Sequence, residues 1–187
     1  MRIGALALVL GLAVTVLALD QLAKAWVVAS LTEWQVIDVL GEALQFVFVR
    51  NPGAAFSLGG GVTWIFAILA AAVAVVIVVF ARRIRSLAWA TVFGMLLGGV
   101  LGNLTDRLLR EPGFGTGHVI DFIKIWGFPA IFNVADIAIT GSMVLLVLLT
   151  LFGIGLDGSR QRKATLSGSP AASDATADVP PAPPKQP

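Results

Sequence analysis

Two aspartates in apolar surroundings are the side chains of this sequence best suited to acid–base chemistry. Asp121 lies in the run VIDFI, and Asp136 lies fifteen positions later in the run FNVADI. Two carboxylates in a low-dielectric site cannot both ionise easily, so one serves as general base and the other as general acid. Such a pair can direct water at an amide carbonyl. Each aspartate alone also has a structural explanation, because Asp136 could cap a helix and Asp121 could pair with Lys124.

Other catalytic chemistries have little support in the residue inventory. The chain has no cysteine and a single histidine, His118, and it lacks the HExxH pattern of metalloproteases. A Ser–His system would need His118, but no serine stands in a nucleophile-elbow context. A Ser–Lys pair through Lys24 or Lys124 stays formally open. We therefore expect no metal site and no cofactor.

The composition is that of a membrane protein. Of the 187 residues, 57% are hydrophobic and only 13% are charged, whereas soluble domains carry about 25% charge. The mean hydropathy is +0.90. The apolar residues fall in long runs, which is typical of helices that span a bilayer.

Four such runs predict an all-α membrane protein with four transmembrane helices. A cleaved signal peptide is the competing interpretation of the first run, but no small-residue cleavage site separates it from DQLAK. The spans are expected at Ile3 to Ser30, Val62 to Ala81, Ser86 to Thr105 and Phe132 to Leu156. Residues 1–156 would form the membrane domain, and the Ala/Pro-rich residues 157–187 a disordered cytoplasmic tail.

The basic residues predict how the spans are oriented. Arg2, the arginines at 82–85 and the basic residues at 160–163 would all lie on one side. The positive-inside rule makes that side cytoplasmic, with both termini there. The segments 31–61 and 106–131 then lie outside. Residues 33–50 have strand-like composition with a turn at Gly41-Glu42, which predicts a small extracytoplasmic sheet. The glycines of the 106–131 loop (Gly113, Gly115, Gly117) could let it close over a site.

Several more polar residues lie at the outer ends of the spans, where an ionisable group is by default a functional candidate. Asp20 and Lys24 are four residues apart and could pair on one helix face. Asn103 and Arg107 share a face in the same way, although Arg107 alone could snorkel to headgroups. Gly99 and Gly102 favour close helix packing. Asn51, in the run NPGAAF, could present its amide to a substrate backbone.

These motifs together resemble those of signal peptidase II, the lipoprotein signal peptidase family. The matching runs are DQLAK (20–24), NPGAAF (51–56), GxxGNxxDR (99–107), VIDF (119–122) and FNVAD (132–136). The resemblance covers about residues 3–156. It implies an aspartic endopeptidase that cuts prolipoproteins before a diacylglyceryl-modified cysteine. The family's catalytic aspartates fall on Asp121 and Asp136. Its supporting and substrate-binding polar residues fall on Asp20, Lys24, Asn51, Asn103, Arg107 and Asn133.

The resemblance also implies partners and location. We expect a monomer in the bacterial inner membrane, with its active site at the outer face. The partners would be lipid-modified prolipoproteins and membrane lipid, without nucleic acid. A small proton-coupled transporter is the alternative function, and a structural or assembly protein is a third. The carboxylates cluster at one end of the spans instead of tracing a path across the bilayer, which favours the peptidase.

Overall fold

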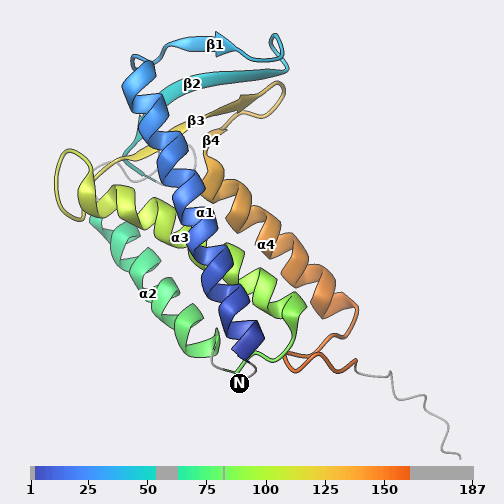
Figure 1. Cartoon of the computed structure of the whole chain (residues 1–187). Coiled ribbons are helices and arrows are strands. Elements are labelled where there is room, and N and C mark those ends of the chain that lie inside the picture. The colour runs from blue at the N-terminus through green and yellow to red at the C-terminus, as the bar shows by residue number, and fades with distance from the viewer. Residues whose placement is uncertain (1–2, 54–62, 82, 161–187) are drawn as a thin grey trace, which may run out of the picture.

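The described residues form four long helices, capped at one end by a small sheet (Figure 1). The computed structural model describes residues 3–53, 63–81 and 83–160. All four helices are long and apolar enough to span a membrane: α1 (Ile3–Ser30), α2 (Thr63–Ala81), α3 (Leu87–Leu109) and α4 (Val134–Leu151). The predicted fold class, with its four spans and small sheet, is confirmed.

The bounds of two helices, α3 and α4, differ from the sequence-based expectation. α3 continues past Thr105 to Leu109, because the charged residues that follow Thr105 are held by partners instead of marking a membrane surface. α4 begins only at Val134, since Asn133 is its N-cap. It ends at Leu151, where Gly153 adopts a positive φ of 66°.

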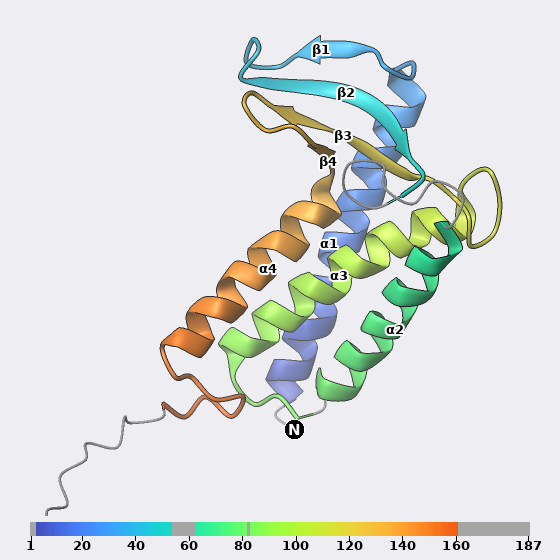
Figure 2. The same ribbon diagram turned by 180° about the vertical axis from the view of Figure 1, so that it is seen from behind.

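α3 is the central helix and contacts the other three (Figure 2). Its glycines permit this close packing. A Cβ added at Gly98 would lie 2.7 Å from the Cβ of Val16 in α1, and one at Gly99 would lie 2.6 Å from the carbonyl oxygen of Ala135 in α4. The expected role of Gly99 in helix packing is therefore confirmed. The outward faces of the helices leave many large apolar side chains exposed, as a lipid-facing surface requires.

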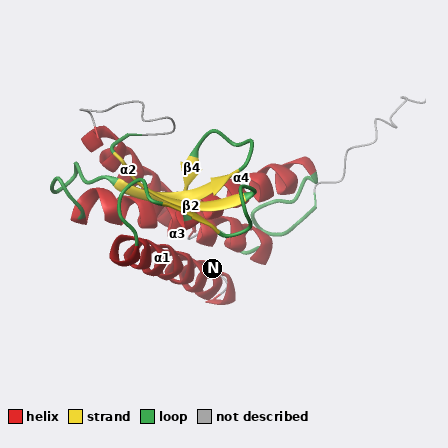
Figure 3. Ribbon diagram, turned by 90° about the horizontal axis from the view of Figure 1, so that it is seen from above, coloured by secondary structure: helices red, strands yellow, loops and turns green. Residues whose placement is uncertain are grey.

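The sheet is antiparallel, with strand order β1-β2-β3-β4. Its strands are β1 (Val36–Asp38), β2 (Leu44–Asn51), β3 (Val119–Ile125) and β4 (Ile131–Phe132). The β1–β2 hairpin is the one predicted, and Gly41 in its turn has a φ of +56°. Seen from above, the strands lie across the helix ends (Figure 3). Phe48, Ile120 and Phe122 pack there on Val27 and Leu31.

The opposite end of the helix bundle holds the N-terminus, the α2–α3 connection and residues 152–160 (Figure 1). The backbone N–H groups of Arg85 and Ser86 donate to the Leu156 carbonyl, at 3.0 and 3.1 Å. The described part of the chain thus gathers Arg83, Arg85 and Arg160 at the end far from the sheet. Arg2, Arg82, the remaining basic residues of 160–163, the run 54–56 of NPGAAF and most of the predicted tail lie outside the described residues.

Candidate active site

A pocket of about 840 Å³ lies between the sheet and the adjoining ends of α3 and α4. Both aspartates singled out from the sequence line it, Asp121 from β3 and Asp136 from the first turn of α4. The pocket also exposes three of the predicted polar residues, which are Asn51, Asn103 and Arg107. The remaining wall is largely apolar, and several of its residues come from the β3–β4 turn and from α4.

Asp121 is nearly buried, with 4% of its surface exposed. Its two carboxylate oxygens accept hydrogen bonds from the Asn51 amide at 2.9 Å and the Asn133 amide at 2.7 Å. Burial raises the pKa of Asp121 to about 6, with the charge of Asp136 adding to the rise and the two amides opposing it. The ion pair with Lys124, considered as an alternative, is not formed. Asp121 is therefore a carboxyl group that holds its proton unusually well.

Asp136 takes part in the N-terminal cap of α4 without being the cap residue. Asn133 is the N-cap, and its side-chain oxygen accepts from the Asp136 backbone N–H at 3.0 Å. In return the Asp136 carboxylate accepts from the Asn133 backbone N–H at 3.2 Å, which completes a capping box. The amide of Asn103 donates to the other carboxylate oxygen at 2.8 Å. The part that Asp136 plays in the helix cap is therefore compatible with its place in the pocket wall.

Asn133 joins the two aspartates. The side chain is fully buried, and its oxygen accepts a hydrogen bond from the Asp136 backbone N–H. Its NH₂ group donates to the Asp121 carboxylate and, at 3.1 Å, to the side-chain oxygen of Asn103. Because one amide fixes both β3 and the start of α4, the relative position of the carboxyl groups does not depend on a substrate.

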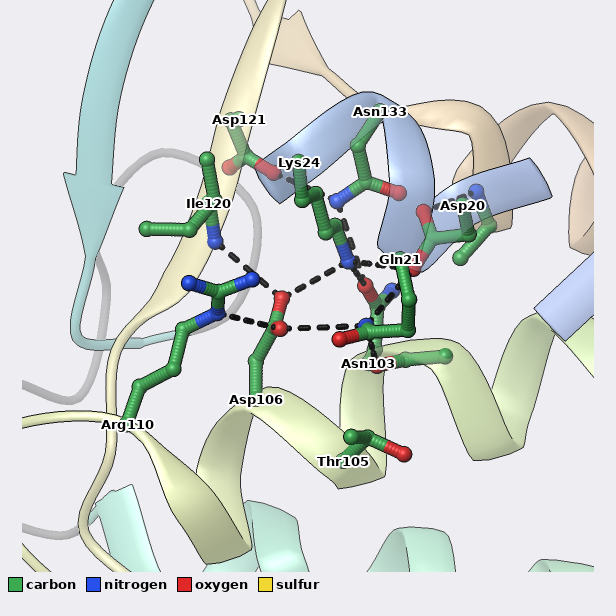
Figure 4. A network of polar contacts seen from close by, with 12 residues as sticks. Asp20, Gln21, Lys24, Asn103, Thr105, Asp106, Arg110, Ile120, Asp121 and Asn133 are labelled. Atoms are coloured by element: carbon green, nitrogen blue, oxygen red, sulfur yellow. Dashed lines mark hydrogen bonds and ion pairs between the residues drawn. The ribbon is translucent and has the colours of Figure 1, made fainter. Parts of the chain in front are cut away.

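Beneath the pocket, Lys24 forms a buried ionic cluster (Figure 4). Its ammonium group lies 2.8 Å from Asp20, 2.7 Å from Asp106 and 2.9 Å from the side-chain oxygen of Asn103. Lysine carries three N–H donors and no acceptor, so each donor has one partner. The side chains of Lys24, Asp20 and Asp106 are 0% exposed. The expected pair between Asp20 and Lys24 is present, but both residues lie under the pocket and not in its wall.

The cluster fixes the orientation of a pocket amide. Only the oxygen of the Asn103 side chain can face an ammonium group, so its NH₂ must turn toward Asp136. Lys24 thereby acts on Asp136 through Asn103. Asp20 adds a second link, since its carboxylate accepts from the backbone N–H of Ala135 at 2.9 Å and so ties α1 to the start of α4.

Asp106 is the functional residue that the sequence reasoning left without a role. Besides Lys24, its carboxylate accepts from Arg110 at 2.7 Å, from Gln21 at 3.2 Å and from the Ile120 backbone N–H at 3.3 Å. Ile120 immediately precedes Asp121, so Asp106 connects α3 to the strand that carries a candidate catalytic group. The four-residue spacing of Asp106 and Arg110 was the signal available in the sequence.

Arg107 faces the pocket. It donates to the Asn103 backbone carbonyl at 3.2 Å and to the Gly53 carbonyl at 3.3 Å, and it lies over the Phe66 ring. Its Nε–H is buried, with no acceptor among the described residues. This arrangement differs from an arginine that snorkels to headgroups. The glycines at 113–117, in contrast, lie outside the pocket wall, which is built by residues 128–132 instead.

Two linked carboxyl groups in the wall of a pocket of a helical membrane protein fit the site of a membrane-embedded hydrolase. A family model described as signal peptidase (SPase) II matches residues 12–152. The chain therefore belongs to the signal peptidase II family and is a peptidase of the bacterial membrane, with the aspartic chemistry that this family uses.

Relatives and solved structures agree with this assignment. The chain is 56% identical over 181 residues to the lipoprotein signal peptidase of Leifsonia xyli subsp. xyli, covering 95% of this chain and 84% of that protein. Identity to the lipoprotein signal peptidase of Mycobacterium avium is 44%, covering 84% and 86%. A solved bacterial membrane enzyme matches with a TM-score of 0.71 at 28% identity, covering 87% of this chain and 97% of that one. None of these matches supports the alternative of a proton-coupled transporter.

Proposed function

We propose that Asp121 and Asp136 together hydrolyse the peptide bond that joins a signal peptide to a lipid-modified prolipoprotein. Removal of signal peptides from prolipoproteins follows from the family and its curated relatives. The cut falls before a cysteine that carries a diacylglyceryl group. The observation that carries the residue assignment is the buried Asn133 amide, which holds both carboxyl groups at one pocket.

We assign Asp121 the role of general acid, because its raised pKa lets it keep a proton at a higher pH than an ordinary aspartate does. Burial favours the neutral form of Asp121. The backbone N–H of Asn133 and the amide of Asn103 donate to the two carboxylate oxygens of Asp136 and fix their orientation at the pocket. We assign Asp136 the role of general base.

The reaction then proceeds in two proton-balanced steps. Asp136 takes a proton from water as the oxygen attacks the carbonyl carbon, and Asp121 gives its proton to the carbonyl oxygen, which yields a tetrahedral diol. Asp136 next passes its proton to the leaving nitrogen as the C–N bond breaks. Asp121 recovers a proton from a diol hydroxyl group, which regenerates the resting dyad.

Three polar groups in the pocket wall assist this reaction. Arg107 lines the pocket, so its guanidinium group can contact a substrate carbonyl or negative charge that develops on oxygen. The amides of Asn51 and Asn103 hold the carboxyl groups and lie close enough to the pocket to contact substrate backbone. Asp20, Lys24 and Asn133 support these groups from below.

The sheet end of the molecule, with the pocket, faces the outer side of the bacterial inner membrane. Both termini lie in the cytoplasm, and residues 157–187 extend from the membrane domain of residues 1–156. Arg83 and Arg85 in the α2–α3 connection, and Arg160 in the segment paired with it, lie at the opposite end and support this orientation. Both carboxyl groups and the side chains that contact them belong to one chain, so a monomer would be sufficient for the proposed reaction.

Purified protein incubated with a synthetic prolipoprotein peptide tests the proposal. With a diacylglyceryl-modified cysteine, mass spectrometry should detect one cut, on the N-terminal side of that cysteine. The same peptide without lipid should be cleaved at least about 100-fold more slowly, because the lipid supplies binding energy that positions the bond. Cleavage at another bond, or equal rates for the two peptides, would contradict the assignment.

A further inference from the structure

Trp34 has a backbone conformation that its residue type avoids. Its φ is +67°, and it is the one non-glycine residue with a positive φ in residues 3–53, 63–81 and 83–160. The left-handed region crowds Cβ against the carbonyl oxygen, so glycine and asparagine use it routinely and bulky residues do not. A tryptophan here breaks a local rule of sequence–structure compatibility, and such exceptions concentrate at functional sites.

The surrounding hydrogen bonds hold Trp34 in this conformation. The Gln35 backbone N–H donates to the Thr32 carbonyl at 3.0 Å, which closes a four-residue turn with Trp34 at its third position. The Gln35 side-chain oxygen accepts from the Thr32 backbone N–H at 2.9 Å, and the Trp34 N–H donates to Phe48 of β2 at 2.8 Å. Turns with a positive φ at that position normally use glycine or asparagine.

Packing does not explain why tryptophan occupies the position. The side chain is 67% exposed, so the strained backbone is not compensated by burial of the indole. Trp34 also makes no aromatic pair with the other described rings. It does line the pocket that contains Asp121 and Asp136. The turn therefore presents an exposed indole at the edge of the proposed active site.

We propose that Trp34 is a specificity-determining residue that packs against the glyceryl and acyl part of the lipid-modified substrate. This inference rests on the proposed function. The polar wall of the pocket suits the peptide bond, whereas Trp34, Val49, Phe128 and Ile131 form apolar wall on the sheet side. An indole combines a large apolar face with an N–H donor, and tryptophan favours the membrane interface, where the ester groups of lipids lie. Trp34 thus matches the boundary between glyceryl ester and acyl chain.

Cleavage kinetics of the full-length protein test this role. The substrates are two peptides of identical sequence whose cysteine carries either a dipalmitoyl-glyceryl or a dibutyryl-glyceryl group. Trp34→Asn should raise KM for the long-chain peptide about tenfold and change KM for the short-chain peptide less than about twofold, with kcat preserved for both. Asparagine tolerates a positive φ, so Tm should be unchanged or higher. Trp126→Asn is the matched control, since Trp126 is 74% exposed but does not line the pocket.

If Trp34→Asn has wild-type KM values for both peptides, the proposal is overturned. It is also overturned if KM rises equally for both peptides and Tm falls. A binding measurement keeps the test independent of cleavage. A lipopeptide with brominated acyl chains should quench less of the tryptophan fluorescence in Trp34→Phe than in Trp126→Phe, and equal quenching would also overturn the role of Trp34. If the wild-type protein cleaves neither peptide but Trp34 is still quenched, the proposed function fails while the lipid contact stands.

Discussion

At the scale of single residues, the chemistry depends on how the protein treats two carboxyl groups differently. Asp121 is buried on a strand between two amides, and Asp136 lies in the first turn of a helix within a capping box. Burial thus favours the protonated form of Asp121, whereas Asp136 is held by the capping box and by the Asn103 amide. Asn133 contacts both and is the residue through which their positions are coupled.

The raised pKa of Asp121 has a consequence for stability. Burial raises the pKa from 3.8 to about 6 in the folded protein, so the folded state binds the proton more tightly than the unfolded state. The resulting stabilisation is complete below about pH 4 and is lost as the pH rises through about 6, up to about 3 kcal/mol in all. We expect Tm in detergent to fall between about pH 5 and about pH 7.5.

Asp121→Asn should remove this pH dependence, because an amide cannot titrate. Asp38→Asn is the control, since Asp38 is an exposed aspartate of β1, and it should keep the wild-type slope. Differential scanning fluorimetry across the pH range makes the comparison. An unchanged slope in Asp121→Asn would show that another group is responsible.

The residue types of the site could be predicted from the sequence, but their connections could not. Asp121, Asp136 and the pocket asparagines stand out because polar residues are rare in and beside apolar spans. Asp106 was left without a role because a charged residue at the end of a span resembles an interfacial residue, and only the fold brings Lys24 to it. Trp34 was missed because no local pattern reveals a positive φ.

At the scale of elements, the Lys24 cluster connects α1, α3, β3 and the start of α4. Lys24→Met would leave Asp20 buried without a cation and Asp106 with Arg110 alone, and breaking one side of a buried ion pair costs about 3–5 kcal/mol. We therefore expect a large loss of Tm and of activity. The single variant does not show whether activity is lost because the protein unfolds or because the Asn103 amide is no longer oriented toward Asp136.

The triple variant Asp20→Asn, Lys24→Met, Asp106→Asn makes that separation. It removes the buried charges together, so most of the lost Tm should return. Activity should stay at least about tenfold below wild type, because no cation then turns the Asn103 amide toward Asp136. Tm and cleavage rate measured on the same preparations provide both readouts. Wild-type activity in the triple variant would contradict the positioning role of Lys24.

Helix packing gives a second prediction at this scale. Gly99→Ala would place a Cβ 2.6 Å from a backbone oxygen of α4, and overpacking of this kind costs about 1–3 kcal/mol. Gly11→Ala in α1 is the matched control, because nothing lies within 4 Å of the added Cβ. Thermal unfolding in detergent should show a lower Tm for Gly99→Ala alone. Equal Tm values would show that α3 and α4 can separate without cost.

The longer and more regular a helix or strand is, the better it could be predicted from the sequence. The four spans and the β1–β2 hairpin follow from apolar runs and turn chemistry. β4 contains only Ile131–Phe132, which is too short for any pattern. The end of α3 at Leu109 depends on Asp106 being neutralised by Lys24 and Arg110, a contact between distant parts of the chain that local sequence does not encode.

At the scale of the whole molecule, the proposed function requires that the protein has one orientation in the membrane. The chain has no cysteine, so single introduced cysteines can be labelled without background. Glu42→Cys, in the hairpin turn, should react with a membrane-impermeant maleimide in intact spheroplasts. Ser159→Cys, at the opposite end, should react only after the membrane is permeabilised. The reverse pattern would place the pocket in the cytoplasm and contradict the proposed orientation.

The most direct test of the central claim is the cleavage rate of Asp121→Asn and Asp136→Asn under single-turnover conditions with the lipid-modified peptide. Each substitution preserves side-chain size but removes one member of the acid–base pair. We expect both purified variants to insert into membranes and to bind the peptide, with cleavage at least about 10³-fold slower than wild type. Substantial turnover by either variant would contradict the assignment of Asp121 and Asp136 as the catalytic dyad.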